Sequence, residues 1–262
     1  MFRFESIYLD NANVSGRIID IFRPDQISAS TAVFFIHGGG WRAGSRTIYH
    51  PIMSLLCSKG IFCASADYRL DVNVLEQLGD LREAYSFFST ELLKDNISKI
   101  MVFGSSAGGH LALLLALARP GACGEKVLSN ACHGNQPIAV TTVSAPVNFV
   151  PWPEMFPPIA EDMRRAAGVA YEADPSLYLR LSPICHIGID SCPVLLLHAE
   201  NEHMFPLSQS IDFQKKMKLF NCHCELKIYP DAEHGFFYNV TRKCQRDAFL
   251  DMELFLQRLM AF

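Results

Sequence analysis

The sequence predicts an α/β fold, with a mostly parallel central β-sheet and helices on both faces. Short, continuously apolar runs recur along the 262 residues, and longer segments with apolar residues at helical spacing separate them. Half of the residues are hydrophobic and only 19% are charged, which is enough apolar material for one deep core. No internal repeat or linker interrupts this pattern, so we expect a single domain over residues 1–262.

Seven apolar segments are expected to be strands. They are short, and several are apolar throughout, as is typical of strands that are buried on both faces of a sheet. In chain order they are Ile18–Phe22, Ala32–Ile36, Ile61–Ala66, Ile100–Phe103, Ile138–Val143, Val194–Leu197 and Leu226–Tyr229.

Helices are expected between these strands. Apolar residues at helical spacing mark the longest of them, and Gly60 closes the first. The expected helices are Ile52–Lys59, Val74–Leu93, Leu111–Ala118 and Arg242–Met260.

Residues 146–185 depart from the alternation. They contain seven of the fourteen prolines, mixed with aromatic residues and short helical pieces. Proline-rich stretches neither continue a helix nor form a central strand. The segment is either a small lid or pocket wall, with Trp152 and Phe156 as candidate substrate contacts, or a surface loop packed on its own aromatic residues.

A Gly-x-Ser-x-Gly pattern at residues 104–108 has Ser106 at its centre. The apolar run before it and the helical run after it predict a strand, a sharp turn and a helix, which is the context of a nucleophile elbow. Such a turn needs glycines because side chains there would collide with the neighbouring strand and helix. We therefore expect Ser106 to be a nucleophile at a helix N-terminus.

A nucleophilic serine needs a base and an acid that orients the base. His234 directly follows the last expected strand, where ligand-binding loops lie in such sheets, so we expect it to be the base. The acid should follow the preceding strand, where Glu202 and Glu200 are the candidates. We expect Glu202, with Glu200 as the alternative. The more distant candidates are Asp190, Asp212 and Asp231.

Donors for a developing oxyanion are expected in His37-Gly38-Gly39-Gly40-Trp41, which follows an expected strand. Glycines allow the backbone itself to approach a substrate oxygen. The expected donors are the N–H groups of Gly39, Gly40 and Ala107. A phosphate-binding loop is disfavoured, because no lysine follows at Walker spacing and Gly-x-Gly-x-x-Gly is absent.

These motifs together resemble α/β-hydrolases, and more narrowly the acetyl esterase and acetylxylan/feruloyl esterase group with a His-Gly-Gly-Gly oxyanion motif. Residues 104–112 are very similar to the elbow of that group, and residues 67–70, 182–184 and 234–236 resemble its other motifs. Its acid motif, laid on residues 198–206, places the family aspartate on Glu202. The family glycine and valine in that motif fall on Ala199 and Phe205, so the motif is only partly kept.

The resemblance implies a serine carboxylesterase that acts on small-molecule esters, with acetyl esters and acetylated carbohydrates as the first candidates. Kynurenine formamidases share the His-Gly-Gly-x-Trp feature. Because Trp41, a candidate pocket residue, completes this feature here, an amide substrate is the alternative to an ester. A non-catalytic binding protein is the alternative from another class. It is disfavoured because Ser106 and His234 are both present.

Composition and charge indicate which other partners to expect. A net charge of −4 without a basic run predicts no nucleic-acid partner, and no signal peptide or membrane-length apolar stretch is visible. The nine cysteines include Cys132 and suggest free thiols in a reducing, cytoplasmic compartment. Cys222-His223-Cys224 lacks a second pair at zinc-finger spacing, so neither a metal nor a cofactor is expected. The sequence leaves the oligomeric state open.

Overall fold

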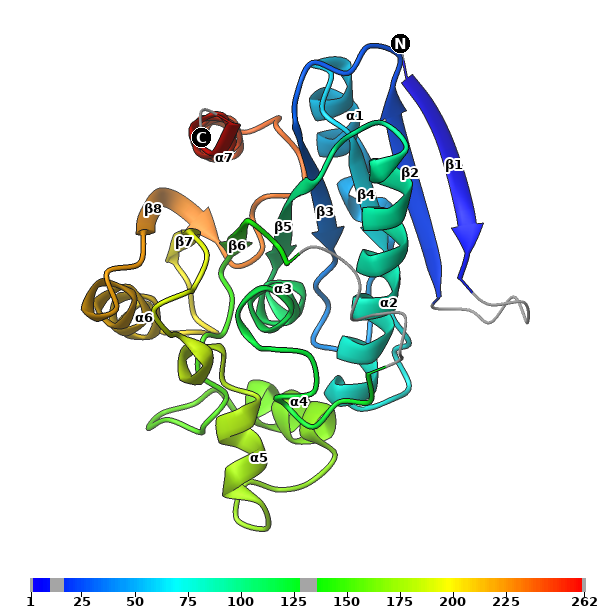
Figure 1. Cartoon of the computed structure of the whole chain (residues 1–262). Coiled ribbons are helices and arrows are strands. Elements are labelled where there is room, and N and C mark those ends of the chain that lie inside the picture. The colour runs from blue at the N-terminus through cyan, green and yellow to red at the C-terminus, as the bar shows by residue number, and fades with distance from the viewer. Residues whose placement is uncertain (1, 10–16, 128–135, 261–262) are drawn as a thin grey trace.

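One eight-stranded sheet, in the order β1-β2-β4-β3-β5-β6-β7-β8, organises the described chain (Figure 1). The structure is a computed structural model and describes residues 2–9, 17–127 and 136–260. Neighbouring strands from β4 to β8 are parallel, whereas β2 pairs antiparallel with both β1 and β4. The strands are β1 Phe2–Tyr8, β2 Ile18–Pro24, β3 Thr31–Ile36, β4 Cys63–Ala66, β5 Lys99–Ser105, β6 Ala139–Val143, β7 Val194–Asn201 and β8 Cys224–Glu233.

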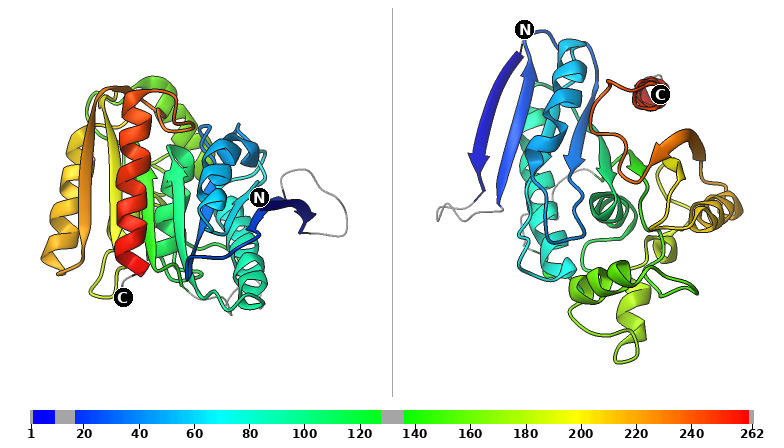
Figure 2. Two further views of the ribbon diagram at one scale, coloured as in Figure 1. Left: turned by 90° about the horizontal axis from the view of Figure 1, so that it is seen from above. Right: turned by 180° about the vertical axis from the view of Figure 1, so that it is seen from behind.

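Helices cover both faces of the sheet (Figures 1 and 2). Helices α1 (His50–Ser58) and α7 (Lys243–Met260) enclose one apolar core with the side chains of one sheet face. Helices α2 (Val74–Leu93), α3 (Ala107–Leu117) and α6 (Leu207–Leu219) enclose a second core on the other face. This is the predicted arrangement, because strands that are apolar throughout need cover on both sides.

Strand β1 and helix α6 were not predicted from the sequence. Strand β1 alternates Phe and polar residues on a largely exposed sheet edge, so it lacks the continuous apolar run of the inner strands. Helix α6 buries only Ser210, Phe213 and Met217. These positions do lie at helical spacing. Because only two of the three are apolar, the apolar pattern of α6 is weaker than that of the helices with more buried residues.

The segment 146–185 forms α4 (Pro157–Ala167), α5 (Pro175–Arg180) and the 3₁₀ helix η3 (Pro183–His186), between β6 and β7. Prolines occupy the first turn of α4, where no N–H donor is needed, and Gly168 ends the helix in a left-handed conformation. Buried residues of α4, including Ile159 and Met163, join the core formed with α2 and α3. The segment is therefore packed on that helical face, as Figure 1 shows beneath α3.

The parallel sheet brings distant loops to one edge. The chain leaves β3 at His37, β5 at Ser106, β7 at Glu202 and β8 at His234. Because the carboxyl ends of parallel strands meet at one edge of a sheet, these four residues gather there.

The pairing of β7 with β8 is irregular at the ends that precede Glu202 and His234. Ala199 pairs with Tyr229, but Asn201 pairs with Glu233, so β8 contains extra residues and extends beyond the Tyr229 end expected from the sequence. The residues that follow this last pair are Glu202 and His234. The bulge therefore brings these two side chains next to each other.

Candidate active site

Ser106 lies on a strained turn between β5 and α3. Its φ of 54° and ψ of −126° are outside the usual regions for a residue with a side chain. The N–H of Ser106 donates to the carbonyl of Val143 (2.8 Å), and its carbonyl accepts from the N–H of His110 (3.0 Å). These bonds hold the turn between β6 and the first turn of α3.

The glycines around Ser106 are required by close backbone approaches. A Cβ on Gly108 would overlap the carbonyl oxygens of Ile36 and His37, and a Cβ on Gly104 would overlap the backbone of Gly108. The elbow can therefore lie against the end of β3 only while both positions are glycine.

His234 connects Ser106 to a carboxylate. Its Nε2 lies 2.9 Å from Oγ of Ser106, and its Nδ1 lies 2.7 Å from Oε2 of Glu202. The His234 side chain is 13% exposed and that of Glu202 is 1% exposed, so this chain of hydrogen bonds is largely shielded from water.

The environment of Glu202 favours its charged form. Burial alone would raise the pKa of this carboxyl, but the hydrogen bond and charge of His234 and the N–H of Met204 outweigh burial and lower it. Oε1 accepts the N–H of Met204 at 2.8 Å and that of Phe205 at 3.3 Å. Glu202 therefore presents a fixed carboxylate to His234.

Backbone N–H groups without an acceptor in the described chain occur in the glycine loop and directly after Ser106. Among the described residues, the N–H groups of Gly39, Gly40 and Ala107 have no hydrogen-bond acceptor in the protein. Gly38 packs against Ser106, because a Cβ built on it would lie 3.3 Å from that of Ser106. Gly39 and Gly40 adopt φ values of 120° and 59°, the left-handed region that favours glycine.

The loop that carries these glycines is fixed by buried polar contacts. The Tyr68 hydroxyl donates to the carbonyl of His37 (2.9 Å), and the two rings stack at 4.3 Å. Burial lowers the pKa of His37 and so favours its neutral form. Asp67 accepts hydrogen bonds from the N–H and the guanidinium of Arg46, which joins the loop to the end of β4.

Trp41, a candidate pocket residue, is buried among aromatic side chains. Its side chain is only 3% exposed, and its ring packs edge-on against His110 and Phe149. Its Nε1 donates to Nδ1 of His110, whose Nε2 in turn donates to the carbonyl of Leu181. This packing leaves Trp41 little surface for a substrate.

The other two candidate pocket residues, Trp152 and Phe156, lie near the loop that carries Glu202. The Trp152 ring lies 6.1 Å from that of Phe205, and the Phe205 ring lies 5.7 Å from that of His234. Phe156 is 45% exposed, with its ring 6.4 Å from His203. Segment 146–185 therefore reaches the loop that carries Glu202. Phe205, which sequence reasoning did not single out as a site residue, connects them.

The alternative acids lie elsewhere. Glu200 is exposed and accepts only a long bond (3.4 Å) from the N–H of Asp231, while Asp212 pairs with Lys215 and Asp190 lines a separate cavity. His198 is buried, with Nδ1 3.2 Å from Oγ of Ser210. Cys132 and His133 lie outside the described residues.

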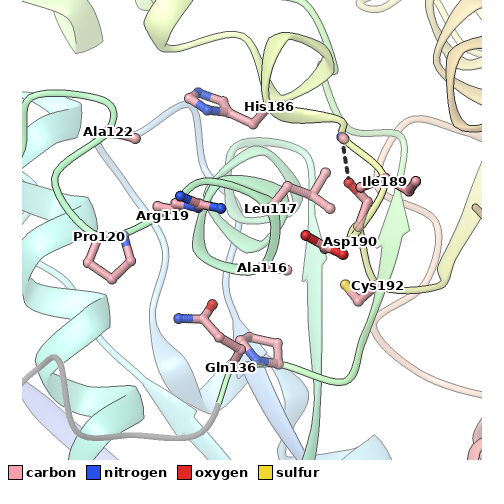
Figure 3. A pocket seen from close by; sticks show the side chains of 13 residues that line it. Ala116, Leu117, Arg119, Pro120, Ala122, Gln136, His186, Ile189, Asp190 and Cys192 are labelled. Atoms are coloured by element: carbon pink, nitrogen blue, oxygen red, sulfur yellow. Dashed lines mark hydrogen bonds between the residues drawn. The ribbon is translucent and has the colours of Figure 1, made fainter. Parts of the chain in front are cut away.

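That separate cavity, of about 780 Å³, lies at the far end of α3 from Ser106 (Figure 3). Ala116, Leu117, Arg119, His186, Asp190 and Cys192 line it. Ser106 precedes the first residue of α3, whereas Ala116 and Leu117 are its last two, so the cavity is not part of the Ser106 site.

The described residues contain neither a cluster of potential metal ligands nor a long apolar helix. No group of three or more His, Cys, Asp or Glu residues there could hold a metal ion. None of the described helices is long and apolar enough to cross a bilayer. The eight cysteines described are free thiols.

Comparison with known proteins identifies a family. The family model described as BD-FAE matches residues 19–217. The probable carboxylic ester hydrolase LipM of Mycobacterium tuberculosis is 28% identical over 240 residues, which cover 83% of this chain and 53% of LipM. The chain spans about half the length of LipM and of esterase LipQ from the same organism.

Solved structures share the fold. Thermogutta terrifontis esterase 2 phosphonylated by sarin has a TM-score of 0.80 at 22% identity, covering 97% of this chain and 94% of that one. A truncated form of a carbohydrate esterase from gut microbiota has a TM-score of 0.83 at 18% identity, covering 99% and 97%. These likenesses confirm the fold expected from the motifs.

Proposed function

The chain belongs to the BD-FAE family and has the α/β-hydrolase fold, and on this basis we propose that it is a serine carboxylic ester hydrolase. The observation that carries the proposal is the pair of hydrogen bonds from His234, to Oγ of Ser106 and to the carboxylate of Glu202. A hydroxyl, an imidazole and a buried carboxylate in this order form the arrangement that activates a serine for acyl transfer.

Each residue then has a defined role. Oγ of Ser106 attacks the ester carbonyl carbon while Nε2 of His234 takes its proton, and Glu202 stabilises the imidazolium. The N–H groups of Gly39, Gly40 and Ala107 bind the oxyanion. The tetrahedral adduct expels the alcohol, which takes the proton from Nε2. Water, deprotonated by His234, then releases the acid and regenerates Ser106.

We propose small acyl esters, acetyl esters first, as substrates, with acetylated carbohydrate as the candidate natural class. Ser106 is 8% exposed, and Gly39 is exposed in the loop whose Gly38 packs against Ser106, so the nucleophile lies close to the surface. The structural likeness to a carbohydrate esterase agrees with this choice.

A Ser106→Ala variant tests the proposal. We expect its turnover of p-nitrophenyl acetate to fall on the order of 10⁴- to 10⁶-fold, with unchanged thermal unfolding. A fluorophosphonate probe should label the wild type and leave the variant unlabelled. Near-complete activity in the variant would exclude Ser106 as the nucleophile.

A substrate panel tests the finer choice. We expect acetyl esters to be turned over faster than butyryl and feruloyl esters, and N-formylkynurenine to be poor. The amide alternative rested on Trp41, whose buried contacts with His110 and Phe149 give it no support. Faster turnover of N-formylkynurenine than of acetyl esters would replace the esterase proposal by a formamidase.

A further inference from the structure

A carboxylate from the inserted segment lies over the glycine loop. Asp162, in α4, has its Oδ2 only 3.0 Å from the point that a Cβ on Gly40 would occupy. Any side chain at position 40 would therefore meet this carboxylate. Asp162 thus lies beside one of the N–H groups to which the proposed function assigns the oxyanion.

The two oxygens of Asp162 differ in their partners. Oδ1 accepts from Nε of Arg42 at 2.8 Å and from Nη1 of Arg165 at 3.5 Å. Within the described residues, Oδ2 accepts no hydrogen bond, although the side chain is only 13% exposed. The ion pair thus fixes the carboxylate and leaves one acceptor oxygen directed toward Gly40.

Arg42 adds donors beside that acceptor. Its side chain is 54% exposed and uses Nε for Asp162, and its terminal nitrogens have no partner among the described residues. Arg42 lies two residues after Gly40, so the donors and the acceptor border the same loop. Together they offer a hydrogen-bond acceptor and hydrogen-bond donors side by side.

The Asp162–Arg42 ion pair suits a neutral leaving group. It carries no net charge, so the pair as a whole offers little electrostatic attraction to a charged one. A neutral polyol can satisfy both the carboxylate and the guanidinium, because each hydroxyl donates through its hydrogen and accepts through its oxygen.

We propose that Asp162 is a specificity-determining residue that accepts a hydrogen bond from a hydroxyl of a polyhydroxylated, carbohydrate-like leaving group, with Arg42 holding the carboxylate in place. The inference rests on the proposed esterase function and names the part of the chain that would recognise its alcohol.

Two esters with the same reacting group separate this role from a structural one. 6-O-acetylglucose has free hydroxyls on a six-membered ring, whereas cyclohexylmethyl acetate has the same kind of primary ester on a ring without hydroxyls. We expect Asp162→Ala to lower kcat/KM for 6-O-acetylglucose by about 10- to 100-fold, mainly through KM, and to change that for cyclohexylmethyl acetate less than about threefold.

Two further variants sharpen the comparison. Asp162→Asn keeps an acceptor oxygen and should lose less than Asp162→Ala on 6-O-acetylglucose. Glu161→Gln is the matched control, because Glu161 is the adjacent carboxylate in α4, half exposed and paired with Arg164. We expect it to leave both substrates unchanged.

The outcomes are distinct. Equal losses on both esters would show that Asp162 only supports the loop, and no loss on either would show that it does not contact the alcohol, so each result would overturn the inference. A wild type that prefers cyclohexylmethyl acetate would overturn it too, while leaving the esterase function intact. Absence of Ser106-dependent hydrolysis of both esters and of p-nitrophenyl acetate would overturn the proposed function itself.

Discussion

Oε2 of Glu202 lies 2.7 Å from Nδ1 of His234, and the other oxygen of the same carboxylate accepts the N–H of Met204. A glutamate thus occupies the place that the resembling family gives to an aspartate. Glu202 directly follows the irregular end of β7.

Replacing this carboxylate should remove most activity. We expect Glu202→Gln to lower kcat for p-nitrophenyl acetate by roughly 10²- to 10⁴-fold, because the neutral amide no longer stabilises the imidazolium. Glu200→Gln is the control, since Glu200 is exposed and has only a long contact with Asp231. If the two variants lost activity equally, the assignment of Glu202 would be wrong.

The close approach at Gly108 predicts a loss of stability. A Cβ in Gly108→Ala would overlap the backbone of Ile36 and His37, so we expect destabilisation by about 1–3 kcal/mol or more. Gly188→Ala is the matched control, because a Cβ there meets nothing within 4 Å. Chemical denaturation of both variants checks this, and equal stabilities would contradict the tight packing of the elbow against β3.

Buried His110 predicts an acid-dependent loss of stability. Burial lowers its pKa from 6.5 to about 4, so between these pH values the unfolded chain binds a proton that the folded chain does not. The free energy of unfolding is therefore not reduced by His110 above pH 6.5. It falls by roughly 3 kcal/mol in all as the pH decreases from 6.5 to 4.

The variant His110→Gln isolates this effect, because it removes the titrating group. We expect it to be less stable than the wild type at pH 8, and its stability to fall less steeply between pH 6.5 and 4. Denaturant unfolding across this range measures both slopes. Parallel slopes would show that His110 is not the group responsible.

Breaking the buried ion pair between Arg82 and Glu125 should lower the stability of the fold. Nε of Arg82 donates to Oε1 of Glu125 at 2.7 Å, and both side chains are almost fully buried. Arg82→Leu would leave the Glu125 carboxylate buried without its cation, so we expect a loss of about 3–5 kcal/mol in unfolding free energy.

The control for this pair is Arg164→Leu, which breaks the exposed contact with Glu161. We expect a change below about 1 kcal/mol there, because water screens exposed ion pairs. Similar losses in the two variants would argue against a desolvated Arg82–Glu125 pair.

Much of the architecture was predictable from the amino-acid order. The inner strands were recognisable as continuous apolar runs, because strands buried on both faces have no polar side to alternate with. Edge strand β1 and helix α6 were not predicted, because they are partly exposed and polar residues interrupt the apolar pattern on which such prediction depends. The burial of Trp41 was not predictable, because its neighbours His110 and Phe149 come from distant parts of the chain.

By itself the sequence determined the elbow around Ser106, the glycine loop and the position of His234 after the last strand, because each depends on local residue types. Only the tertiary structure shows that Glu202, and not Glu200, is hydrogen-bonded to His234, and only it brings Asp162 over Gly40. The first depends on the register shift between β7 and β8, and the second on the packing of α4 against the α2 and α3 face. Both are relations between segments far apart in the chain, which local patterns do not encode.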